Sequence, residues 1–241
     1  MGGAVKRGVT WDRVLIDVCT QRDYLDPGAI LQVANLDELI THLGQVFRWA
    51  LEQRIGVVSS IESHRASEPL NGWPLHCIDG TPGQSKPDFT LLKPAAMVET
   101  DNYLSLPPDL RKDYRQLIFR KRSRDVLGNP KADRFLTQLR LDEYIIVGVG
   151  VERAIKSLAL GLLARHKAVA VVTDACGHWS GADAELAFRQ LAAKGARLTT
   201  AAELTAPPPM PDRHSGSGSR RRRYVRSRLR RYSSSRDPAR S

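Results

Sequence analysis

Residues 144–161, with the sequence YIIVGVGVERAIKSLALG, constrain the fold more than any other stretch of the chain. They begin as an apolar, β-branched segment typical of a fully buried strand, and they turn sharply at Gly150. Beyond the turn, apolar residues recur at helical spacing, at Ala154, Ile155, Leu158, Leu162 and Leu163. Such a turn directs backbone N–H groups and the positive end of the helix dipole at whatever lies above the sheet. An ordinary strand-to-helix connection has the same pattern, so the stretch alone predicts a fold and leaves the function open.

Other segments continue this alternation of strands and helices. Short apolar strands are predicted at residues 14–18, 57–61, 117–119, 144–149, 168–173 and 196–199. Helices are predicted at residues 36–51, 135–139, 154–163 and 182–194. Because strands that alternate with helices pair in parallel, we expect an α/β fold: a single doubly wound, mainly parallel six-stranded sheet with helices on both faces. With 241 residues, of which 41% are apolar, the chain can bury one core of this size.

The positive charge is concentrated at the C-terminal end. The net charge is +11, and residues 213–241 carry +10 of it, because they hold eleven arginines and one acidic residue, Asp237. Composition divides the chain into an N-terminal extension at 1–11, a folded domain at 12–204, a Pro/Gly/Ser linker at 205–219 and a disordered Arg/Ser-rich tail at 220–241. Two interpretations of the tail stay open: non-specific RNA or DNA binding, and a solvated extension without a partner. An anionic membrane surface is less favoured because the tail has no apolar face.

Composition also bears on the cellular compartment. No apolar run approaches the roughly 20 residues that span a bilayer, and no secretory signal follows the N-terminal basic residues. Three cysteines at unrelated spacings argue against a disulfide framework. We therefore expect a reduced, cytoplasmic protein without a membrane span.

Polar side chains follow two of the predicted strands. Asp17 stands at the end of the first strand, where ligands of open α/β sheets bind, although a cap explains it equally well. Glu62 and His64 follow the second strand, and His76 lies in the next loop. Carboxylate and imidazole donors suit Zn, Fe or Mn, so a divalent metal is one interpretation. The commoner alternative is that such histidines only cap or hydrogen-bond.

Together these segments resemble the isochorismatase-like cysteine hydrolases, which include nicotinamidases and N-carbamoyl amidohydrolases. The resemblance covers roughly residues 12–204, and the order of several motifs carries it. The matching positions are Asp17 after the first strand, Lys121 after the third, VGVGVERA at 147–154, TDA at 173–175 and WPLHCIDGTPG at 73–83. The resemblance implies a Rossmann-type three-layer sandwich. It also implies a homo-oligomer and a small-molecule ligand whose identity depends on loops 65–115.

In that family an Asp acts as general base on a cysteine thiol, a lysine balances the charge, and two backbone N–H groups hold the oxyanion. The resemblance assigns the base to Asp17, the lysine to Lys121 and the oxyanion donors to Gly150 and Ala154. Ala154 also occupies the position of the nucleophile, and a methyl group cannot attack a carbonyl. Cys19, Cys77 and Cys176 are not expected to replace it.

One motif departs from the family further. The first motif usually reads D-x-Q-x-D-F. Here Gln21 and Tyr24, the counterparts of its Q and F, each stand two residues further from Asp17 than the motif requires.

Two hypotheses follow from the altered motifs. In the first, the protein is a degenerate, non-thiol member that binds a small carbonyl or carboxylate ligand. In the second, it is an active hydrolase without cysteine, as isochorismatases proper are. Asp17 would then act with Lys121, or a metal on Glu62, His64 and His76 would activate water. The resemblance maps the nicotinamidase metal ligands onto these last three residues.

Overall fold

The computed structural model describes residues 9–70, 72–100, 105–106 and 109–207. Most of the predicted N-terminal extension and linker, and all of the Arg/Ser-rich tail, lie outside the described residues. The folded part begins with strand β1 at Thr10.

Among the described residues, seven strands form one sheet in the order β3-β4-β2-β1-β5-β6-β7, and every pairing is parallel. The strands are β1 (Thr10–Val18), β2 (Ile55–Glu62), β3 (Ala95–Val98), β4 (Gln116–Lys121), β5 (Glu143–Val149), β6 (Val169–Gly177) and β7 (Arg197–Thr199). The predicted α/β class with a single parallel sheet is confirmed, and each of the six predicted strands overlaps one of these. The additional strand is β3, a short edge strand whose sequence AAMV lacks the β-branched run on which the prediction depended.

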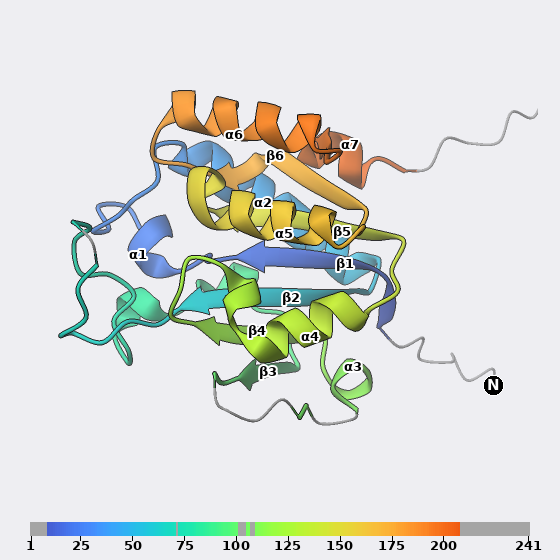
Figure 1. Ribbon diagram of the computed structural model, residues 1–241, viewed down its shortest axis with the longest axis horizontal. Coiled ribbons are helices and arrows are strands. Elements are labelled where there is room, and N and C mark those ends of the chain that lie inside the picture. Colours follow the sequence, from blue (N-terminus) through green and yellow to red (C-terminus); the bar gives the residue numbers. More distant parts are fainter. Residues whose placement is uncertain (1–8, 71, 101–104, 107–108, 208–241) are drawn as a thin grey trace, which may run out of the picture. The chain divides into compact units, whose positions relative to one another are not determined.

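Helices cover both faces of the sheet (Figure 1). The α-helices are α1 (Arg22–Leu25), α2 (Leu36–Glu52), α3 (Leu110–Asp113), α4 (Pro130–Gln138), α5 (Lys156–Ala164), α6 (Gly181–Ala193) and α7 (Ala201–Thr205). Short 3-10 turns are η1 (Pro82–Gln84), η2 (Asp88–Thr90) and η3 (Val126–Gly128), and η4 (Val151–Ile155) is a π-helical turn. Helix α2 packs on α7, β2 and β6, and α5 packs on α6 and β6. None of the described helices is long and apolar enough to cross a bilayer.

Local sequence explains where the helices form. In α2 the apolar residues fall on one face, and Leu39, Leu43 and Val46 are completely buried against the sheet. Helix α4 begins at Pro130, whose fixed φ suits the first helical position, and the Asn129 side chain accepts hydrogen bonds from the first free N–H groups.

The strand order shows where in the sheet a ligand is expected to bind. The chain proceeds from β1 to β2 on one side, and β5 pairs with β1 on the other, so the switch point lies between β1 and β5. The two strands approach closely at Gly148, which has φ of 121°, and a Cβ there would lie 2.1 Å from the carbonyl oxygen of Val18. Only glycine fits this contact. The carboxyl ends of β1, β2, β4 and β5 therefore converge on one crevice.

Candidate functional site

A pocket of about 250 Å³ opens at the carboxyl ends of these strands. Its lining includes Cys19 beyond β1, Glu62 at the end of β2, and Gly150 and Ala154 beyond β5. Loop residues complete the wall, among them His64, Glu68, Trp73, His76 and Trp179. The pocket thus lies where the α/β topology predicts a ligand.

The carboxylate of Glu62 forms hydrogen bonds or ion pairs with several side chains of the site. Its Oε1 lies 2.6 Å from Nζ of Lys121, which is 1% exposed, and its Oε2 accepts a hydrogen bond from the Tyr24 hydroxyl. Burial raises the pKa of the Glu62 carboxyl. The charge of Lys121 and the hydrogen bonds from His64 and His76 outweigh burial and hold this pKa well below its usual range. The pocket floor therefore carries a fixed carboxylate beside a fixed ammonium group.

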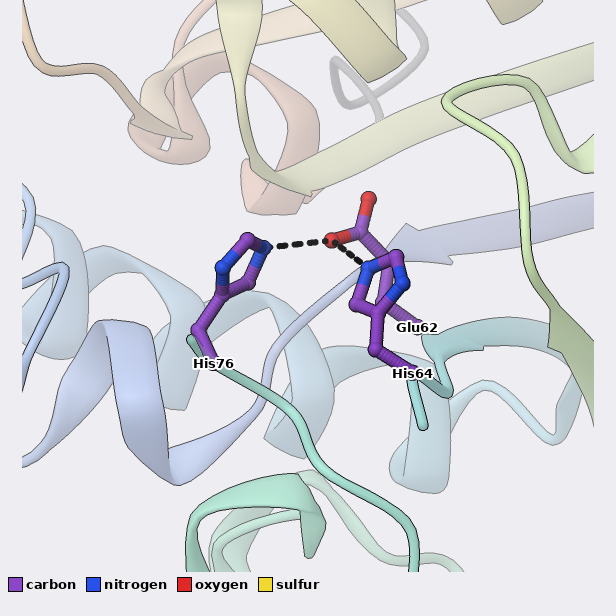
Figure 2. Close-up of side chains that lie close together, drawn as sticks. All are labelled: Glu62, His64 and His76. Carbon is purple, nitrogen blue, oxygen red and sulfur yellow. Dashed lines mark ion pairs between the residues drawn. The ribbon is translucent and has the colours of Figure 1, made fainter. Parts of the chain in front are cut away.

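His64 and His76 approach the same carboxylate oxygen (Figure 2). Nε2 of His76 lies 3.4 Å from Oε2 of Glu62, and Nε2 of His64 lies 3.7 Å from it. Main-chain hydrogen bonds bring the two histidines together, because the N–H of His64 donates to the carbonyl of Cys77 at 3.0 Å. The N–H of Asp79 donates to the His64 carbonyl at 2.9 Å. These bonds join the 73–83 loop to the end of β2.

The three residues fit a divalent metal. One ligand atom from each of Glu62, His64 and His76 can be chosen so that all lie within 4.8 Å of one another. Nδ1 of His76 lies 2.7 Å from the carbonyl of Pro74, which leaves Nε2 free as a ligand atom. Nδ1 of His64 faces Oε1 of Glu68 at 3.5 Å. One carboxylate and two imidazoles suit Zn, Fe or Mn, and the predicted donor set is therefore brought together.

Asp17 and Lys121 are not brought together, in contrast to the sequence prediction. Asp17 is completely buried, and it does not line the pocket. Its carboxylate accepts from Nζ of Lys86 at 2.5 Å, from Ser59 at 2.7 Å and from Thr20 at 2.8 Å. A buried lysine other than Lys121 thus neutralises this carboxylate. Sequence reasoning missed Lys86 because it lies in the 65–115 segment, where no motif is diagnostic.

Cys19 occupies the pocket position that was expected for Asp17. The backbone leaves extended geometry at Cys19, where φ is 52°, so the strand alternation does not continue through it. The motif itself contains the signal: when Gln21 and Tyr24 are aligned with the Q and F of D-x-Q-x-D-F, Cys19 falls on the first D. The two-residue delay in the motif therefore has a structural explanation.

The Cys19 thiol is not activated. Burial raises its pKa to about 12, and the nearby charge of Lys121 offsets only part of this effect. Its Sγ lies 3.8 Å from Oε1 of Glu62 and 3.9 Å from the Ser60 hydroxyl. The group stays a protonated thiol at neutral pH.

Ala154 lies in the turn that the sequence predicted. Gly150 adopts the left-handed conformation, and the π-helical turn η4 follows it. Among the described residues, the N–H of Ala154 makes no main-chain hydrogen bond to a residue outside η4. The expectation for Gly150 needs correction, because its N–H donates to the carbonyl of Gly177 at 2.9 Å. The main-chain N–H of Gly150 is therefore already used within the fold.

Comparison with known proteins decides the family. A family model of the isochorismatase domain matches residues 14–203. The chain belongs to the isochorismatase family. No curated protein sequence matches it.

Solved structures share the isochorismatase-family fold at low sequence identity. An isochorismatase-like hydrolase from Alkaliphilus metalliredigens has a TM-score of 0.64 at 19% identity, over 80% of this chain and 96% of that chain. Pyrazinamidase of Pyrococcus horikoshii in complex with zinc has a TM-score of 0.61 at 21% identity, over 78% and 99%. Nicotinamidase/pyrazinamidase from Bacillus subtilis has a TM-score of 0.63 at 14% identity, over 78% and 98%. At these identities the likeness establishes the fold alone.

An aromatic wall closes the outer part of this isochorismatase-family pocket. The ring of Trp179 lies 5.7 Å from that of Tyr24 and 5.2 Å from that of Trp73, measured between centroids. The indole N–H of Trp179 donates to the carbonyl of Leu31 at 2.9 Å, which fixes the ring. Sequence reasoning missed Trp179 because it stands in a connection after β6, without a motif of its own.

Proposed function

We propose that the protein is a non-thiol member of the isochorismatase family that binds a small carbonyl or carboxylate compound in this pocket. The observation that carries the proposal is the methyl group of Ala154, which lines the pocket at the position that the resemblance assigns to the nucleophile. The remaining thiols support it. Burial raises the pKa of Cys19, Cys77 and Cys176, and so opposes formation of a thiolate at any of them.

A panel of amides, N-carbamoyl amines and isochorismate tests the proposal. We expect saturable binding by calorimetry for at least one compound and no acyl adduct on any cysteine by intact mass spectrometry. Cys19→Ser is the informative variant, since Cys19 is the one cysteine that lines the pocket within the described part of the chain. Amide turnover that disappears in Cys19→Ser would contradict the proposal, because it would show that a thiol performs the chemistry.

A second candidate function is metal-assisted hydrolysis, which the convergence of Glu62, His64 and His76 favours. These residues would hold the ion, and a bound divalent metal supplies Lewis-acid polarisation of a substrate carbonyl. Lys121 would neutralise the other oxygen of Glu62, and the N–H of Ala154 would donate to the developing oxyanion. The hydrogen bond from Tyr24 competes with a metal for Oε2 of Glu62.

Elemental analysis and calorimetric titration with Zn²⁺ or Mn²⁺ test this second candidate. We expect one ion per chain in the wild type and loss of binding in His76→Asn. His42→Asn is a matched control, because His42 faces Asp174 instead of the pocket. A metal-free protein that also fails to take up either ion would exclude this function.

The tail has a proposed function of a different class. Its ten arginines among serines suit non-specific binding of RNA or DNA through phosphate. The residues concerned lie outside the described part of the chain, so composition alone supports the proposal.

A further inference from the structure

Three arginines line the pocket: Arg122, Arg124 and Arg153. Arg122 is neutralised, since its guanidinium lies 3.3 Å from Asp79 and 4.0 Å from Glu68. Arg124 and Arg153 have no carboxylate of the described residues within ion-pair distance. The pocket therefore presents two guanidiniums that make no direct ion pair with a described carboxylate, beside one that is already paired.

Arg153 is held in place by aromatic contact. Its Cζ lies 4.1 Å from the centroid of the Trp73 ring, and the edge of Trp179 packs against Trp73. The neighbouring carboxylate of Glu152 is used elsewhere, because its Oε1 accepts from the N–H groups of Trp179 at 2.7 Å and Ser180 at 3.0 Å. The guanidinium is thus oriented without being neutralised.

The main chain of Arg124 is fixed by Lys121. Nζ of Lys121 donates to the carbonyl of Arg124 at 3.2 Å, which fixes this segment beside the pocket floor. Burial, and then the charge of Arg124, lower the pKa of Arg153 below its usual range. Glu62 offsets this in part, but its carboxylate already pairs with Lys121. An anion between the two guanidiniums would relieve their repulsion.

We propose that Arg124 and Arg153 bind the carboxylate of a small planar anion whose ring lies against Tyr24 and Trp179. The inference rests on the proposed ligand pocket and narrows its ligand to a negatively charged ring compound. A guanidinium binds a carboxylate through two parallel N–H donors, which a neutral amide cannot match. The volume of about 250 Å³ limits the ligand to about one ring.

Nicotinate and nicotinamide provide the test, because they have the same shape and differ in charge. We expect calorimetry on the full chain to give at least about tenfold tighter binding for nicotinate. Arg153→Met and Arg124→Met should each lose about tenfold in nicotinate affinity and less than about threefold in nicotinamide affinity. Arg165→Met is the matched control, since that guanidinium pairs with Asp133 and does not line the pocket, and it should change nicotinate affinity less than about threefold.

The outcomes separate this inference from the proposed function. Equal affinity for the two compounds would overturn the anion assignment and leave a ligand pocket without charge preference. Nicotinate binding that survives both substitutions would assign the anion to the arginine-rich tail and also overturn it. Absence of binding by either compound would overturn it too. Nicotinamide turnover through a cysteine adduct would contradict the non-thiol proposal and would leave the anion preference standing.

Discussion

At the scale of single residues, positions 154 and 19 hold alanine and cysteine, where the family resemblance implies the nucleophilic cysteine and the aspartate of a thiol hydrolase. A cysteine at 154 would have no free carboxylate beside it, because Asp17 is paired with Lys86 and Glu62 with Lys121. We therefore expect Ala154→Cys alone to gain no amidase activity. Cys19→Asp combined with Ala154→Cys should exceed it by about 100-fold or more in kcat/KM for nicotinamide, the usual size of general-base catalysis. A single variant as active as the double variant would show that another base reaches position 154.

The pair of Asp17 and Lys86 should stabilise the fold. Both side chains are almost completely buried, so removing one partner leaves an uncompensated charge. We expect Lys86→Met to lower the free energy of unfolding by about 3–5 kcal/mol in urea denaturation. Lys112→Met, which breaks the exposed pair with Asp109, should change it by less than about 1 kcal/mol. Equal effects of the two substitutions would contradict a structural role for the buried pair.

At the scale of elements, the loop that supplies His76 depends on Asp79. Its carboxylate accepts hydrogen bonds from Ser63 and Gln84 and pairs with Arg120 at 3.0 Å. Burial opposes ionisation, yet these hydrogen bonds and the charge of Arg120 lower the pKa of Asp79. Because the folded pKa is depressed, the stabilisation is present above the ordinary value of 3.8 and is lost as pH falls through the folded value.

Thermal unfolding of Asp79→Asn between pH 3 and pH 7 measures this contribution. We expect the variant to unfold at a lower temperature than the wild type at neutral pH. The difference in unfolding temperature between the two proteins should become smaller as the pH approaches 3. A difference that is independent of pH would contradict the role of the carboxylate charge.

The elements also show how far sequence reasoning reaches. Strand β5 and the turn at Gly150 could be predicted, because their apolar pattern and glycine are local. Strand β3 could not, since an edge strand of four residues has no such pattern. Cys19 lines the pocket in place of Asp17 because the backbone leaves extended geometry just beyond β1. Hydrophobic periodicity does not encode that change of dihedral angle. Lys86 and Arg124 stand in loops, where no periodicity constrains the chain.

At the scale of the whole molecule, the charge distribution predicts that nucleic-acid binding belongs to the tail alone. Residues 1–212 have a net charge of +1, so they attract a polyanion weakly. We expect affinity for a generic oligonucleotide to fall log-linearly with salt in the full chain and to disappear on deletion of residues 213–241. Circular dichroism should show that the shortened protein keeps its fold. Equal binding by the two forms would contradict the prediction.

Oligomerisation is a further whole-molecule expectation that the family resemblance supplied. Light scattering at micromolar concentration should report a dimer or a larger assembly. A monomer would count against it.

The turn that carries Ala154 has a practical consequence for protein engineering. The turn is held by main-chain bonds: Gly150 donates to Gly177, and Ile155 donates to the carbonyl of Gly150 at 3.0 Å. No side chain at 154 takes part in them, but the methyl group of Ala154 is buried, so the turn accepts only a small replacement without rearrangement. Serine or selenocysteine at this position would project into the same pocket from an unchanged support. The protein therefore offers an attachment point for small reactive groups within an isochorismatase-family scaffold.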